Sequence, residues 1–233
     1  MRFRDRAEAG RQLAARLLAW KAVRPVVFAL PRGGVPVALP VAEALGAPLD
    51  LLLVRKIGAP DQPELALGAV VEGTPPQTVV NEEVVAALGI PPEQVVARAA
   101  DQLAEIGRQR LLWLQGRAPV PPHGRTAILV DDGIATGATV RAALLALGRA
   151  GAARRVLAVP VAPPEAAAAL REACEAVVVL AEPAHFGSVG AFYDDFRQIG
   201  DAEVTALLER HRLRPDRQDP GIRRPDNEPE RDR

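Results

Sequence analysis

Short apolar runs alternate along the chain with longer segments whose apolar residues recur at helical spacing. The short runs are apolar at nearly every position, which is typical of strands buried on both faces of a sheet. We expect such strands at residues 25–30, 50–54, 125–130, 155–161 and 176–180. We expect helices at residues 5–20, 35–46, 92–115, 139–151, 164–173 and 201–211. The alternation predicts an α/β fold, with a Rossmann-like, open twisted parallel sheet and helices on both of its faces.

Two segments depart from this alternation. After an expected loop at 55–65, two short extended runs, 66–73 and 78–81, can pair as a hairpin around "TPPQ". The C-terminal end of the chain has almost no apolar content, which is typical of a disordered tail. We therefore expect one domain over residues 1–211 and a disordered tail over residues 212–233.

Charge and composition exclude several classes of protein. Lys and Arg together number 29, as do Asp and Glu, so no global field would draw the chain to nucleic acid or to an anionic membrane. The one cysteine, Cys174, excludes a disulfide framework and a cysteine-ligated metal site. No apolar run approaches the ~18 residues of a membrane span, and "MRFRDRAEAG" lacks the apolar region of a signal peptide. We expect a cytoplasmic protein that binds neither nucleic acid nor membrane.

The segment "DDGIATGAT" follows one predicted strand and opens the next predicted helix. Backbone N–H groups and the positive dipole end at a helix N-terminus favour phosphate. The glycines permit unusual backbone angles, and the threonines add hydroxyl donors. The lysine of a Walker A loop is absent, which favours a monophosphate over a nucleoside triphosphate. The candidate phosphate-binding residues are Gly133, Ala135, Thr136, Gly137, Ala138 and Thr139.

Two carboxylates, Asp131 and Asp132, stand directly before this loop. Carboxylates repel phosphate but accept hydrogen bonds strongly from hydroxyls. A ribose 5-phosphate, with a phosphate at one end and a vicinal diol at the other, satisfies both halves of the segment. The acids would also place negative charge beside the anomeric carbon, where it stabilises an oxocarbenium-like transition state. The alternative is a strand-to-helix turn with incidental acids, which the order of strand, acids, loop and helix disfavours.

The string "ILVDDGIATGAT" closely resembles the 5-phosphoribosyl-1-pyrophosphate (PRPP) signature of the type I phosphoribosyltransferase family. The resemblance spans roughly residues 1–211 and implies the parallel-sheet core of that family, with a small hood and a flexible loop. It implies PRPP as a substrate, Mg²⁺ as a cofactor, and Asp131 and Asp132 as catalytic residues. Metal contact with these acids would be indirect, through ribose hydroxyls or water. By the same analogy, a homodimer is the expected assembly.

Two more segments resemble loops of the family. "FALPRGGVPVA" resembles its pyrophosphate loop, and "VRKIGAPDQPELALGAV" resembles the flexible loop of its adenine-type members. Lys56 and Glu64 of the second loop are candidate catalytic residues, with Glu64 touching the acceptor. The alternatives are an ordinary glycine turn for the first loop and a solvated surface loop for the second. The candidate pyrophosphate-binding residues are Arg32, Gly33, Gly34, Arg55 and Lys56.

Residues 185–201 hold three of the five Phe residues and the one Tyr. This segment resembles the C-terminal stretch of a family subgroup whose acceptor is not assigned. Phe186, Phe192 and Tyr193 are candidates for a hood that stacks on an acceptor base; packing into a small C-terminal core is at least as compatible with the pattern. The segment 79–120 is longer than in compact members, which leaves acceptor access and oligomer geometry open.

The predicted activity is Mg²⁺-dependent transfer of a phosphoribosyl group from PRPP to a base, with a purine as the first expectation because of the flexible loop. Two alternatives stay open. In the first, the chain is a non-catalytic PRPP sensor, a hypothesis favoured by the lack of a convincing base-specificity motif. In the second, it is a hydrolase that uses water as acceptor. The apparently intact flexible loop with Lys56 favours a transferase over a sensor.

Overall fold

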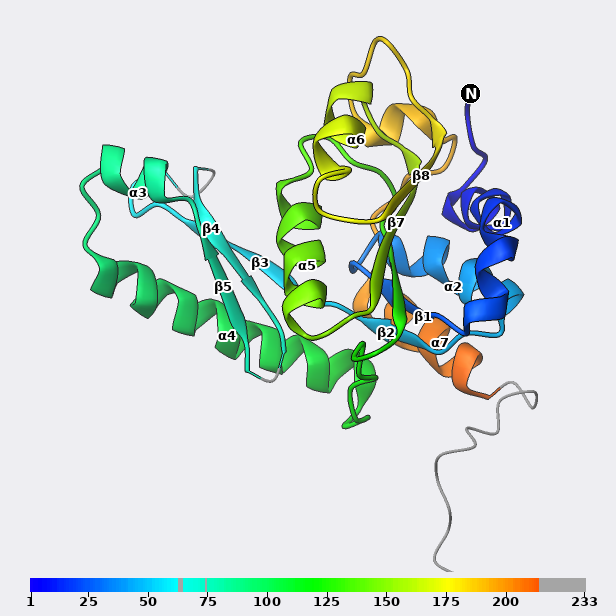
Figure 1. Cartoon of the computed structure of the whole chain (residues 1–233), viewed down its shortest axis with the longest axis horizontal. Coiled ribbons are helices and arrows are strands. Elements are labelled where there is room, and N and C mark those ends of the chain that lie inside the picture. Colours follow the sequence, from blue (N-terminus) through cyan, green and yellow to red (C-terminus); the bar gives the residue numbers. More distant parts are fainter. Residues whose placement is uncertain (63–64, 74, 214–233) are drawn as a thin grey trace, which may run out of the picture.

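The computed structural model describes residues 1–62, 65–73 and 75–213. At its centre is a five-stranded parallel sheet with the strand order β2-β1-β6-β7-β8 (Figure 1). The chain moves outward in one direction from β1 to β2 and in the other from β6 to β8. The order therefore reverses between β1 and β6, and open α/β sheets bind ligands beyond the carboxyl ends of the strands at such a point. The strands are β1 (Val26–Ala29), β2 (Leu49–Leu51), β6 (Thr126–Val130), β7 (Arg154–Val161) and β8 (Ala176–Ala181).

Helices cover both faces of this sheet because its strands send alternate side chains into two cores. In β1, Val27 and Ala29 belong to one core, and Val26 and Phe28 belong to the other. The helices α1, α2, α4 and α7 pack on the first core, and α5 and α6 pack on the second. The fold is thus α/β with a central parallel sheet, as predicted. The helix bounds are α1 (Arg6–Leu17), α2 (Gly34–Leu45), α4 (Pro92–Leu114), α5 (Ala138–Arg149), α6 (Pro164–Leu170) and α7 (Asp201–Arg212).

A second, antiparallel sheet forms a lobe beside this core (Figure 1). Ile57 packs into the core that α4 shares, whereas Ala69 and Val79 pack against the core that α5 shares. The lobe is therefore held between α4 and α5. Its position thus depends on α5, the helix that begins at the candidate phosphate-binding residues 133–139, called the phosphate-type loop. Its elements are β3 (Val54–Gly58), β4 (Ala66–Val71), β5 (Gln77–Val80) and the short helix α3 (Glu82–Ala87).

The predicted helices and buried strands are all present, with ends that shift by a few residues. The loop expected at 55–65 is wrong at its start, because residues 54–58 pair with β4 as a strand. The predicted hairpin of β4 and β5 is confirmed. The tail expected at 212–233 lies outside the described residues from position 214 on, so it stays a prediction. None of the helices in the described part of the chain is long and apolar enough to cross a bilayer.

Candidate active site

The phosphate-type loop joins β6 to α5 at the carboxyl end of the central sheet. Gly137 has a φ of 79°, in the left-handed region, and it caps α5 without a side-chain hydrogen bond. The first amides of α5 are therefore available to an anion. Thr136 and Thr139 are exposed, so their hydroxyl groups can also reach a ligand. The structure thus places the predicted phosphate-binding residues, from 133 to 139, in one turn and the helix start after it.

Asp131 and Asp132, called the acid pair, stand at the end of β6. They lie against the loop that follows β1 and contains Gly33 and Gly34, called the glycine-rich loop. The N–H of Leu30 donates to the carbonyl of Val130 at 2.9 Å, which joins the two strand ends. A Cβ atom at Gly33 would overlap the Asp132 carboxylate, and one at Gly34 would lie 2.7 Å from the carbonyl oxygen of Val130. The two loops can approach this closely only because positions 33 and 34 are glycine. The predicted diol site and pyrophosphate loop therefore lie side by side at the reversal of strand order.

Arg6, in the first turn of α1, also reaches the acid pair. Its Nε donates to Oδ2 of Asp132 at 2.8 Å, and its Nη1 donates to the carbonyl of Arg197 at 2.9 Å. The guanidinium lies 3.9 Å from the ring centroid of Phe196, and Arg6 is only 8% exposed. Sequence reasoning missed Arg6, because it is one of many arginines and the helical pattern around it does not separate a buried arginine from solvated ones.

Burial dominates the electrostatics of the acid pair. It raises the pKa of both carboxyls, and the charge of Asp132 raises the pKa of Asp131 further, to well above its ordinary value. The hydrogen bond and charge of Arg6 oppose the rise in the pKa of Asp132. Two adjacent buried carboxylates ionise together only if positive charge is supplied nearby. Among the described residues, no group of three or more His, Cys, Asp or Glu side chains could hold a metal ion.

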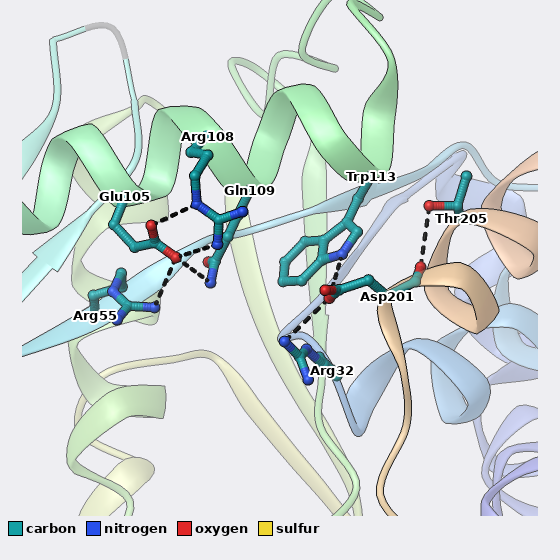
Figure 2. Close-up of polar contacts among 8 residues, drawn as sticks. All are labelled: Arg32, Arg55, Glu105, Arg108, Gln109, Trp113, Asp201 and Thr205. Carbon is teal, nitrogen blue, oxygen red and sulfur yellow. Dashed lines mark hydrogen bonds and ion pairs between the residues drawn. The ribbon is translucent and has the colours of Figure 1, made fainter.

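Arg32 follows a cis peptide bond after Pro31, in the glycine-rich loop. Its Nη2 lies 3.1 Å from Oδ1 of Asp201, and Nε1 of Trp113 donates to the same oxygen at 2.9 Å (Figure 2). Asp201 is the first residue of α7, where the helix dipole favours a negative charge. The predicted diphosphate ligand Arg32 is thus held by an acid of its own chain.

The structure separates the two basic residues that were predicted to neutralise diphosphate together. Arg55 turns toward α4, where its Nε donates to Gln102 at 2.8 Å. Its Nη1 lies 3.9 Å from Glu105 (Figure 2). The exposed Lys56 lies on the opposite face of β3, with its cross-strand partner Ala69. Arg55 would have to leave α4 to bind a diphosphate. Glu64 lies outside the described residues.

Tyr193 lies in the small C-terminal core, which was the alternative to its stacking on a base. Tyr193 is 2% exposed and packs against Phe3, and its hydroxyl donates to the backbone carbonyl of Asp132 at 2.6 Å. Burial raises the pKa of this phenol, so the hydroxyl stays a donor. Phe186 and Phe192 are half-buried and stack on each other, with ring centroids 5.7 Å apart. Their role toward a base stays a prediction.

A cavity of about 670 Å³ lies away from the acid pair, where the lobe joins the core. Asp50, Glu72 and Arg110 line it together with apolar side chains of α4 and α5. It does not include the loop after β6, so the cavity and the acid pair are separate features of the molecule.

The comparisons with known proteins agree with the fold. Residues 5–196 match the model of the phosphoribosyl transferase domain family, and the chain belongs to that family. The crystal structure of TT1426 from Thermus thermophilus is similar, with a TM-score of 0.77 and 43% identity, covering 89% of this chain and 98% of that one.

Two curated relatives come from Mycobacterium tuberculosis, strains CDC 1551 and H37Rv, and both carry the name "Putative phosphoribosyl transferase". Each is 47% identical over 208 residues, which cover 89% of this chain and 46% of the relative. The chain thus spans about half the length of the curated relatives that it matches.

Proposed function

We propose that the chain is a Mg²⁺-dependent phosphoribosyltransferase that transfers the 5-phosphoribosyl group of PRPP to a nitrogen of a base and releases diphosphate. A purine is the first expected acceptor. The observation that carries this proposal is the contact between the acid pair and the glycine-rich loop, at the reversal of strand order and directly before a helix N-terminus. This arrangement suits a ligand with a phosphate, a diol and a diphosphate, in that order.

The start of α5, the acid pair and the glycine-rich loop each have a distinct role in the proposed reaction. The first amides of α5 and the hydroxyls of Thr136 and Thr139 bind the 5-phosphate. Asp131 and Asp132 accept hydrogen bonds from the ribose hydroxyls and stabilise positive charge at C1 as its bond to diphosphate breaks. C1 then bonds to the base nitrogen, which loses its proton. The amide of Gly33 would meet the departing diphosphate, whereas the N–H of Gly34 already donates to the carbonyl of Leu30 at 3.0 Å.

The donor set fits Mg²⁺ in one particular way. Two carboxylates stand side by side in the sequence and beside the loop proposed to meet a diphosphate, and Mg²⁺ prefers oxygen ligands and keeps several waters. Asp131 and Asp132 would hold the ion through ribose hydroxyls or water. When bound, Mg²⁺ would neutralise charge on the leaving diphosphate.

The test is release of diphosphate from PRPP and Mg²⁺, with and without a panel of purine and pyrimidine bases. We expect release that depends on one base, which names the acceptor. Release without any base would support a hydrolase instead. Binding of PRPP by calorimetry with no release from any base would contradict the transferase.

A PRPP sensor is the second candidate, and one observation favours it. Arg32 and Arg55, both predicted to meet diphosphate, are held by Asp201 on α7 and by Gln102 and Glu105 on α4. A ligand that drew these arginines away would move two helices without any chemistry. A sensor would bind PRPP and Mg²⁺ but would release no diphosphate with any base.

A further inference from the structure

The N-terminal residues and the segment at 192–197 form one support behind the acid pair. The N–H of Phe3 donates to the carbonyl of Phe192 at 2.8 Å, and the N–H of Asp194 donates back to the carbonyl of Phe3 at 2.8 Å. Phe3 is fully buried and packs against Tyr193. The first turn of α1 is therefore fixed relative to the loop that follows β6, although the two lie far apart in the sequence.

From this support, two side chains hold Asp132 at different atoms. Arg6 donates to its carboxylate through Nε, and Tyr193 donates to its backbone carbonyl through the hydroxyl. The carbonyl of Arg197 and the ring of Phe196 hold the guanidinium of Arg6 in turn. A buried arginine with three such partners has one orientation, and so does the carboxylate that it binds.

The charge of Arg6 matters as much as its geometry. Asp131 and Asp132 are adjacent, partly buried acids, and they lie beside the loop proposed to meet a diphosphate. Without a cation at this position, the pair would repel an incoming ligand that carries phosphate and diphosphate groups. Arg6 engages only Oδ2 of Asp132, and the N–H of Asp132 engages only Oδ1 of Asp131, so Oδ1 of Asp132 and Oδ2 of Asp131 stay available for hydroxyl donors.

We propose that Arg6 is a positioning residue of the active site, which orients Asp132 and offsets part of the charge of the acid pair so that the pair accepts the ribose diol. Tyr193 assists from the backbone side. This inference rests on the proposed function, because it takes the diol as the ligand of the acids. It gives the first turn of α1 a role in selecting the ligand, in addition to the roles of the loops that follow β1 and β6.

The test compares two sugar phosphates that differ by one hydroxyl, ribose 5-phosphate and 2-deoxyribose 5-phosphate, by calorimetry. We expect the wild type to prefer ribose 5-phosphate by about tenfold or more, the usual effect of a hydrogen bond to a charged acceptor. Arg6→Met should bring this ratio close to one, mainly by weakening ribose 5-phosphate. Arg6→Lys should restore part of it, because the ammonium keeps the charge but not the fork of donors.

Arg16→Met is the matched control, because Arg16 is an exposed arginine on the same helix. It should leave the ratio unchanged. Because Arg6→Met leaves a buried carboxylate unpaired, Asp132→Asn and the double variant Arg6→Met/Asp132→Asn are measured beside it. If Arg6 acts through Asp132, the double variant should have the same ratio as Asp132→Asn alone.

The outcomes separate the two proposals. A wild type that binds neither sugar phosphate would overturn the proposed function, and this inference with it. A wild type that prefers ribose 5-phosphate, together with a folded Arg6→Met variant that keeps the preference, would overturn only the role of Arg6. A further loss of the ratio in the double variant, beyond that of Asp132→Asn, would also contradict action through Asp132.

Discussion

The guanidinium groups of Arg6 and Arg110 both meet carboxylates with little exposure to solvent, and their surroundings differ. At the junction of lobe and core, Nη1 of Arg110 lies 2.8 Å from Glu72 and Nη2 lies 3.3 Å from Asp50. At the end of the central sheet, Nε of Arg6 lies 2.8 Å from Asp132, with Asp131 beside it. Each cluster therefore combines one arginine with two acids. We call the cluster of Arg110, Asp50 and Glu72 the junction cluster.

The difference lies in the acceptors that remain. In the junction cluster Asp50 also accepts the N–H groups of Leu51 and Val120, and Glu72 accepts that of Leu53, so both acids have donors from the fold itself. Asp131, by contrast, accepts the N–H of Asp132 through Oδ1, and no donor among the described residues reaches its Oδ2. Oδ2 of Asp131 is therefore open to a ligand, whereas the acids of the junction cluster are satisfied by the fold, which indicates a structural role.

The largest expected effect is on stability at the junction. Arg110→Met should cost about 3–5 kcal/mol of the free energy of unfolding, because it leaves two buried carboxylates without their cation. Binding of ribose 5-phosphate should survive wherever the variant is folded. Urea unfolding measures the loss, with Arg108→Met as control, since Arg108 forms an exposed pair with Glu105. Equal losses in the two variants would show that the junction cluster stabilises the fold no more than an exposed ion pair does.

Glu72 gives the junction a pH dependence. Burial raises its pKa from 4.5 to about 7, since Arg110 is shared with Asp50 and offsets burial only in part. The folded state thus holds a proton that the unfolded state releases near pH 4.5, and stability falls as pH rises from about 4.5 to 7, by up to about 3 kcal/mol. Glu72→Gln should remove most of this fall. Unfolding at pH 5 and pH 8 measures it, and parallel profiles for the two proteins would contradict the assignment.

At the acid pair the expected effect is on turnover. Asp132→Asn should lower kcat by about a hundredfold, as loss of an oriented charge at a transition state does. Binding of the phosphate group should weaken much less, because the first amides of α5 are untouched. Steady-state kinetics and calorimetry with inorganic phosphate measure the two effects. An unchanged kcat would rule out the diol role of this acid.

The smallest expected effect concerns Arg32. Its pair with Asp201 is partly exposed, with side-chain exposures of 36% and 41%, so Asp201→Asn should cost less than about 1 kcal/mol of stability. Diphosphate affinity should rise a few-fold, because Arg32 loses an internal competitor. Calorimetry with diphosphate tests this, with Asp194→Asn as a control at the exposed pair with Arg2. A drop in affinity would mean that Asp201 orients Arg32 for the ligand.

The sequence was sufficient to predict the central sheet and the phosphate-type loop, because both depend on local patterns. Apolar runs defined the buried strands, and the loop after β6 combined glycine, hydroxyl and acid positions in one continuous segment.

The contacts that sequence reasoning missed join residues distant in the chain. Arg6 and Asp132 are 126 positions apart, and Tyr193 is 61 from Asp132. Nothing local distinguishes Arg6 from its exposed neighbours, and an aromatic residue after the last strand suits a hood as well as a core. Strand β3 was missed because "VRKIG" has only one fully buried side chain, Ile57, and its stability comes from pairing with β4.

The most direct test of the central claim is a crystal structure of the protein with ribose 5-phosphate. We predict the phosphate at the first amides of α5 and the ribose hydroxyls against Asp131 and Asp132, with Arg6 still bound to Asp132. A sugar phosphate found instead in the cavity beside Arg110, with the acid pair free of ligand, would contradict the account.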